Sequence, residues 1–184
     1  MADVGAAEIG DTGDAAPVLG HVFFGLAELG FVGQHVADPS EPQARDAFFS
    51  EALDGATKAL VLTEGLLMYL EDRDVIALSE AIKRPEVAWW MLDFAFPGLK
   101  KMMNKRMAGL LQNAPFKFAP ENGLAYFEEL GWRTLEVESL FLAANRFRRL
   151  PIFVRPAAWL PQPDLRHPGG KPWSAAALLT HRVQ

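Results

Sequence analysis

The chain has 184 residues, half of them hydrophobic, with a net charge of -5 and no cysteine. This composition favours one globular domain over a disordered chain and lacks the basic surface that holds a nucleic-acid backbone. The missing cysteines exclude disulfides, thiolate metal sites and cysteine nucleophiles. The sequence offers no basic secretory signal and no apolar run of about 20 residues, so we expect a cytoplasmic protein without a membrane partner.

Apolar periodicity divides the chain into alternating helices and strands. Residues 1–16 are small, acidic and rich in glycine, and we expect a disordered leader before a single domain over 17–184. The segments that predict helices are 17–30, 40–55, 72–83, 99–111 and 122–130. The segments that predict strands are 31–37, 59–63, 87–94, 132–137 and 175–183. The proline-rich block 150–173 predicts a long loop that returns the chain to an edge strand. This alternation is typical of an α/β protein with three layers and a mainly parallel sheet.

One carboxylate follows a predicted strand at a position that favours ligand binding. The apolar run 59–62 predicts a strand that is buried on both faces, and Glu64 begins the following segment Glu-Gly-Leu-Leu-Met-Tyr-Leu. Ligands of open α/β sheets bind outside the carboxyl ends of the strands, so Glu64 is placed to face a ligand. The alternative is that Glu64 lies in the first turn of the next helix, where the helix dipole favours a negative charge.

Two further acids lie at the ends of predicted strands. Asp38 follows the strand 31–37, and Asp93 lies within the strand 87–94, so both are expected near the same edge of the sheet. Carboxylates at such an edge can accept hydrogen bonds from a nucleoside or an ammonium group. The alternatives are a helix-initiating turn at Asp38 and Pro39, and a strand-terminal cap at Asp93.

Other kinds of site have little support in the sequence. No Gly-x-Ser-x-Gly elbow is present, and no histidine has a partner three or four residues away, so neither a hydrolase triad nor a metal site is predicted. The glycine-rich turn at 8–14 follows no apolar strand, so we do not expect it to cradle a phosphate. The basic, methionine-containing helix 99–111 fits either a solvated surface or a lid over a cleft.

The segment 63–70, preceded by Val-Ala-Asp-Pro at 36–39 and a helix, resembles the leucine carboxyl methyltransferase family and its bacterial relatives. The resemblance implies an S-adenosylmethionine-dependent methyltransferase with a Rossmann-like, mainly parallel sheet and an antiparallel edge strand. In that family the adenine end contacts the step matched by Asp38 and Pro39, and the acid matched by Glu64 helps to hold the cofactor. Pro39 stands where leucine is usual and removes a backbone donor. The first strand, the glycine-rich cofactor loop and the ribose-binding acid have no equivalent here, so the domain is expected to be N-terminally incomplete.

The resemblance implies O-methylation or carboxyl-methylation of a small molecule by direct displacement at the sulfonium carbon. Tyr69 is the candidate catalytic residue that orients the acceptor, and its alternative role is that of a half-buried packing residue. Arg146, Arg148 or Arg149 are candidates for holding an anionic group. The rival interpretation is a degenerate or truncated family member that acts as a binding protein without catalysis. Neither interpretation sets the oligomeric state.

Overall fold

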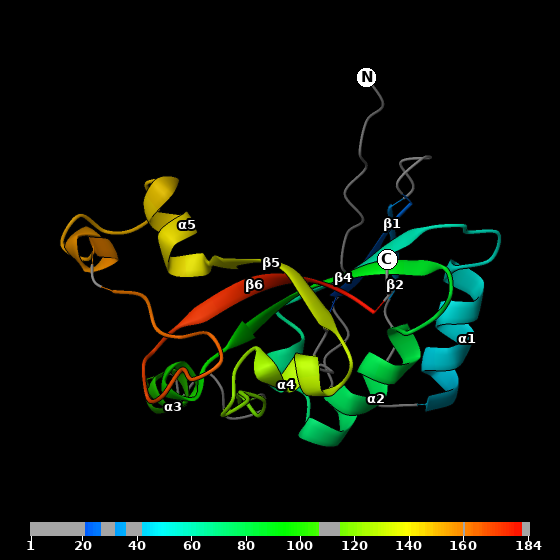
Figure 1. Ribbon diagram of the computed structural model, residues 1–184, viewed down its shortest axis with the longest axis horizontal. Helices are drawn as coiled ribbons and strands as arrows, with labels where there is room; N and C mark the ends of the chain where they lie inside the picture. Colours follow the sequence, from blue (N-terminus) through cyan, green and yellow to red (C-terminus); the bar gives the residue numbers. More distant parts are fainter. Residues whose placement is uncertain (1–20, 27–31, 36–41, 107–114, 160, 182–184) are drawn as a thin grey trace, which may run out of the picture.

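The computed structural model describes residues 21–26, 32–35, 42–106, 115–159 and 161–181. Its strands form a six-stranded sheet in the order β2-β1-β3-β4-β6-β5 (Figure 1). The strands are β1 (His21–Leu26), β2 (Val32–His35), β3 (Ala59–Glu64), β4 (Val87–Ala95), β5 (Arg133–Ser139) and β6 (Ser174–Thr180). Among the described strands, β3 and β4 form the one parallel pair, and the other four pairs are antiparallel. The α/β class is confirmed, but the expectation of a mainly parallel sheet is wrong.

Five α-helices and two short 3-10 helices connect the described strands. The α-helices are α1 (Pro42–Ala52), α2 (Asp72–Ile82), α3 (Pro97–Arg106), α4 (Ala125–Glu129) and α5 (Leu140–Arg146). The 3-10 helices are η1 (Leu67–Tyr69) and η2 (Arg155–Trp159). Four of the α-helices coincide with predicted ones, whereas α5 and η2 lie where no helix was predicted. None of the helices in the described part of the chain is long and apolar enough to cross a membrane.

The helix predicted at 17–30 is wrong over its described residues, because 21–26 form the strand β1. All six residues of β1 pair with β3, from His21 opposite Glu64 to Leu26 opposite Ala59. Phenylalanines suit a strand and Gly25 weakens a helix, so a pairing partner distant in sequence decides the conformation. The predicted leader 1–16 and the residues Asp38 and Pro39 lie outside the described residues.

The hydrophobic core lies on one face of the sheet. Alternate side chains of the central strands, including Trp90 and Phe94, are fully buried there against α1, α2 and α4 (Figure 1). Trp90 meets Phe127 of α4 edge to face, with ring centroids 5.8 Å apart. Burying one such large side chain contributes about 1.5–3 kcal/mol, so this face supplies most of the driving force for folding.

The opposite face of the sheet, called here the open face, has no such layer among the described residues. Its side chains Leu60, Leu62 and Leu178 are half-buried, and Met91 is 39% exposed. Of the described helices, α5 and η2 stand on this side, next to one end of the sheet (Figure 1). The described chain therefore has two layers where three were predicted. The antiparallel strand β6 is also internal, between β4 and β5, rather than at the edge.

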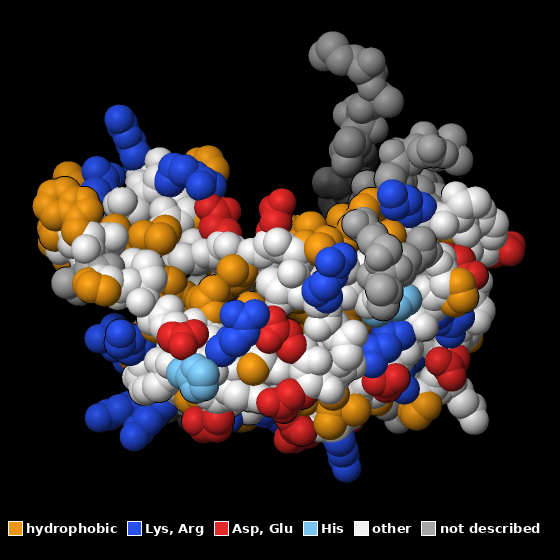
Figure 2. Space-filling view, viewed as in Figure 1, with side chains coloured by type: hydrophobic (Ala, Val, Ile, Leu, Met, Phe, Trp, Pro, Cys, Tyr) orange, Lys and Arg blue, Asp and Glu red, His pale blue; other side chains and the backbone are white. Residues whose placement is uncertain are grey.

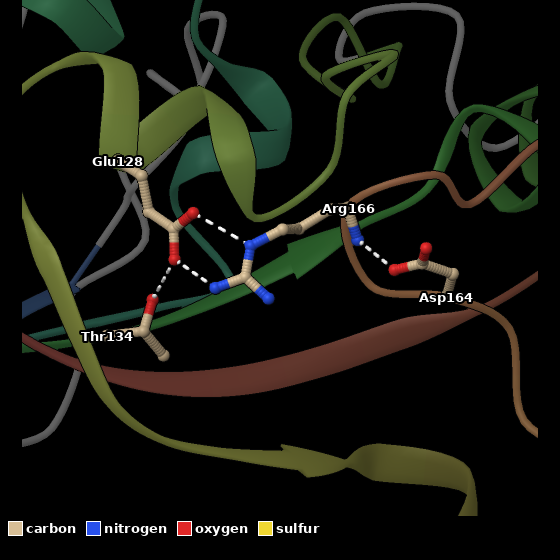
Figure 3. Close-up of polar contacts among 4 residues, drawn as sticks. All are labelled: Glu128, Thr134, Asp164 and Arg166. Atoms are coloured by element: carbon tan, nitrogen blue, oxygen red, sulfur yellow. Dashed lines mark hydrogen bonds and ion pairs between the residues drawn. The ribbon is translucent and has the colours of Figure 1, made fainter.

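The proline-rich segment 150–173 is a long connection, as predicted, and polar contacts hold it against α4 (Figure 3). Arg166 Nε and Nη2 donate to the two carboxylate oxygens of Glu128, at 2.9 and 2.6 Å. The Thr134 hydroxyl donates to the same carboxylate at 3.1 Å, and the Arg166 amide donates to Asp164 at 2.9 Å. These contacts hold the connection in place before it enters β6, the strand that the sequence pattern predicts at the edge of the sheet.

Candidate functional site

Two acids lie at the carboxyl ends of the parallel strands β3 and β4. Glu64 is the last residue of β3 and is exposed, and Asp93 lies near the end of β4 and is half-buried. The register pairs Leu62 with Met91, so the alternation along each strand directs Glu64 and Asp93 to the open face. The strand-end placement predicted for both acids is confirmed by this register.

A hydrogen bond joins the two strand ends. The Gly65 amide donates to Asp93 Oδ1 at 2.8 Å. Gly65 has φ +61°, a left-handed conformation that glycine adopts without the strain that a Cβ would cause. The Glu-Gly step therefore turns the chain out of β3 and aims a backbone donor at β4, while the Glu64 side chain stays exposed. The bond fixes the spacing of the two acids.

The electrostatics of this edge favour cations and hydrogen-bond donors. Burial raises the pKa of the Asp93 carboxyl above its ordinary value, the Gly65 amide partly offsets this by a hydrogen bond, and the nearby Glu64 carboxylate raises the pKa further. Protonation of Asp93, or a cation bound beside it, would relieve the repulsion between the Glu64 and Asp93 carboxylates. Amines, hydroxyls and sulfonium ions fit such a site, whereas phosphate groups do not.

The other predicted site residues are less directly connected with this edge. Tyr69 ends η1 and is half-buried, and its ring meets Phe116 edge to face with centroids 5.2 Å apart. This contact supports the packing role, and a catalytic role for Tyr69 stays a prediction. Asp38 and Pro39 lie outside the described residues, so their predicted cofactor contact stays a prediction as well.

The arginine-rich segment after β5 lies at the same edge of the sheet as the two acids. Ser139 pairs with Ala175, which pairs with Phe94 next to Asp93, so α5 begins where β4 ends. Arg146 in α5 binds Glu138 at 2.6 Å and is largely exposed. The sequence singled out this arginine but not its helix. Ser139, whose hydroxyl accepts from the Leu142 amide at 3.1 Å, is the N-cap signal that indicates α5.

The neighbour of β3 on its other side does not complete a nucleotide-binding crevice. In a doubly wound sheet the adjacent strand runs parallel and its following loop faces the ligand, but β1 is antiparallel and begins at the Glu64 edge. Within the described ranges no glycine-rich turn follows a parallel strand beside β3. The same residues contain no group of three or more His, Asp or Glu side chains that could hold a metal ion.

No protein-family model matches the sequence, and no curated protein matches it. Among solved structures, the fold is similar to that of a SAM-dependent methyltransferase from Anabaena variabilis ATCC 29413, with a TM-score of 0.45 and 13% sequence identity. The match covers 80% of this chain and 58% of that chain, so the present chain spans less than two thirds of that protein's length. This is a distant similarity of fold, and it assigns neither a substrate nor an activity.

Proposed function

We propose that the chain belongs to an S-adenosylmethionine-dependent methyltransferase that methylates an oxygen or carboxylate of a small molecule. The observation that carries the proposal is the Gly65 to Asp93 hydrogen bond beside the exposed Glu64, at the carboxyl ends of two parallel strands. Glu64 and Gly65 lie within the segment 63–70 that resembles the leucine carboxyl methyltransferase family, and Asp93 lies opposite this segment on β4.

The chemistry of the edge suits this cofactor. Glu64 would accept hydrogen bonds from the adenosine part, with Asp38 and Pro39 on the adenine side, and the negative charge of the edge would attract the sulfonium cation. A hydrogen bond to a charged group contributes about 1.5–3 kcal/mol, which is at least tenfold in affinity. The arginines that follow β5 would hold an anionic acceptor at the same edge.

Methyl transfer at such a site requires alignment more than acid-base catalysis. The acceptor oxygen forms a bond to the methyl carbon as the carbon-sulfur bond breaks, and the sulfur keeps the electron pair. A carboxylate acceptor is already nucleophilic, so no general base is needed. Tyr69 would orient the acceptor.

Calorimetric titration with S-adenosylmethionine and with its demethylated product tests the cofactor assignment. We expect heat of binding in the wild type, at least tenfold weaker binding in Glu64→Gln, and unchanged binding in Glu51→Gln, which removes an exposed glutamate from α1. Absence of heat at millimolar ligand, or equal affinities of all three proteins, would contradict the proposal.

The antiparallel direction of β1 favours a second candidate function, a binding protein of the same ancestry without catalysis. A cofactor held from one side only binds but is not aligned for transfer. Transfer of labelled methyl groups to a panel of small carboxylic acids separates the two. Cofactor binding without transfer to any acceptor would support the second function, and a labelled methyl ester would support the first.

A further inference from the structure

The open face carries an apolar groove with an acidic rim. The groove has a volume of about 620 Å³, which is within the range of pockets that hold drug-sized ligands. Glu136 and Glu138 of β5 form the rim and are exposed. The apolar residues that line the groove include Leu60, Met91, Ala176 and Leu178. Figure 2 shows this side of the molecule as a hollow with acidic side chains at its margin.

Next to the groove stands a lobe with the opposite charge, called here the basic arm and formed by residues 140–159. The arm contains four arginines and no aspartate or glutamate. Phe153 is 85% exposed and Trp159 is 86% exposed, and Phe147 and Ile152 are exposed as well. Hydrophobic and basic side chains lie together on this lobe in Figure 2. Exposed apolar groups in such number are typical of an interaction surface.

The arm does not fill the groove of its own chain. Arg146 binds the rim residue Glu138 at 2.6 Å and so fixes the base of the arm beside the groove. Beyond this anchor the side chains of Phe153 and Trp159 are exposed to solvent. Apolar and cationic groups would match the apolar lining and the acidic rim of the groove.

We propose that two copies of this chain form a two-fold symmetric dimer in which the basic arm of each copy docks in the acidic groove of the other. A surface and its complement on the same chain allow a closed, reciprocal pair of contacts. The segment 1–16 is a poorer occupant, because it has four acids and no lysine or arginine, so the acidic rim would repel it. The arm also has the composition of a membrane-interface segment, but a complementary groove on the same chain favours the dimer.

Sedimentation velocity of the full chain over a wide range of concentrations tests this proposal. The arm variant is Phe153→Ser with Trp159→Ser, and the groove variant is Met91→Lys with Glu136→Lys. All four side chains are exposed, so circular dichroism should show native folding. We expect the wild type to dimerise, and each variant alone to dimerise at least tenfold more weakly. Ile76→Ser, which removes an exposed apolar side chain from α2, should dimerise like the wild type.

A mixture of the two variants distinguishes this dimer from other associations. The arm variant keeps an intact groove and the groove variant keeps an intact arm, so an equimolar mixture regains one of the two contacts and should form mixed dimers. A wild type that is monomeric at every concentration, or dimers that both variants leave unchanged, would overturn the proposal. It would also be overturned if the chain stayed monomeric and bound anionic lipid vesicles through Trp159, because the arm would then serve a membrane.

Discussion

A buried hydrogen bond beside the candidate site makes a quantitative test of the fold possible. Trp90 Nε1 of β4 donates to Thr63 Oγ1 of β3 at 3.0 Å, and both side chains are fully buried. Thr63→Val keeps the shape of the side chain but removes the acceptor, which leaves the indole N–H unsatisfied in the core. An unsatisfied buried donor costs about 1–3 kcal/mol. For a domain of this size each kcal/mol lowers Tm by about 2–4 °C, so we expect a loss of about 2–12 °C.

Urea unfolding followed by far-UV circular dichroism measures the free energy of unfolding, and Trp90→Phe supplies the control. In the Trp90→Phe background no indole donor is present, so Thr63→Val should lower the free energy of unfolding much less than it does in the wild type. The double-mutant cycle then isolates the coupling between the two side chains. A coupling energy below about 0.5 kcal/mol, the usual level for independent sites, would refute the reasoning.

Three further predictions concern the carboxylates and one tight turn. Glu128, whose pKa is lowered chiefly by the hydrogen bond from Arg166, stabilises the fold fully above its ordinary pKa of 4.5. The gap in unfolding free energy between the wild type and Glu128→Gln should therefore shrink as the pH falls through the lowered pKa. Burial raises the pKa of Asp93, so urea titrations should show Asp93→Asn gaining stability relative to the wild type as the pH rises above 3.8. Gly123→Ala should lower Tm more than Gly169→Ala: both glycines have positive φ, but only at Gly123 would a Cβ lie 2.3 Å from a backbone carbonyl oxygen.

The elements that the sequence predicts well are those with their own local signal. The strands β3 and β4 follow from short apolar runs, and α2 follows from its amphipathic spacing between Asp72 and Lys83. The sequence pattern predicts a helix at β1, whereas the observed strand depends on pairing with β3, about 40 residues away in the chain. Local propensity cannot report a partner at that separation.

The candidate site likewise has one part that a local pattern predicts and one part that depends on distant pairing. The position of Glu64 at a strand end follows from the apolar run before it. The position of Asp93 beside it, where Asp93 accepts from the Gly65 amide, depends on the register of β3 against β4. That register pairs Leu62 with Met91, and no local pattern specifies it. The sequence named both acids, but only the register shows that they share one face.

The composition of the open face is the strongest reason to expect an occupant. An antiparallel sheet that faces water on one side usually alternates apolar and polar residues, whereas a sheet covered on both sides reads as a continuous apolar run. The strand β3 has such a run, since Leu60 and Leu62 on the open face alternate with Ala59 and Val61 in the core. The described residues supply a helical layer to one face only. Covering the apolar surface of the other face would therefore stabilise the protein by about 25 cal/mol per Å² of buried area. The basic arm of a second copy has the apolar and cationic side chains to cover this surface.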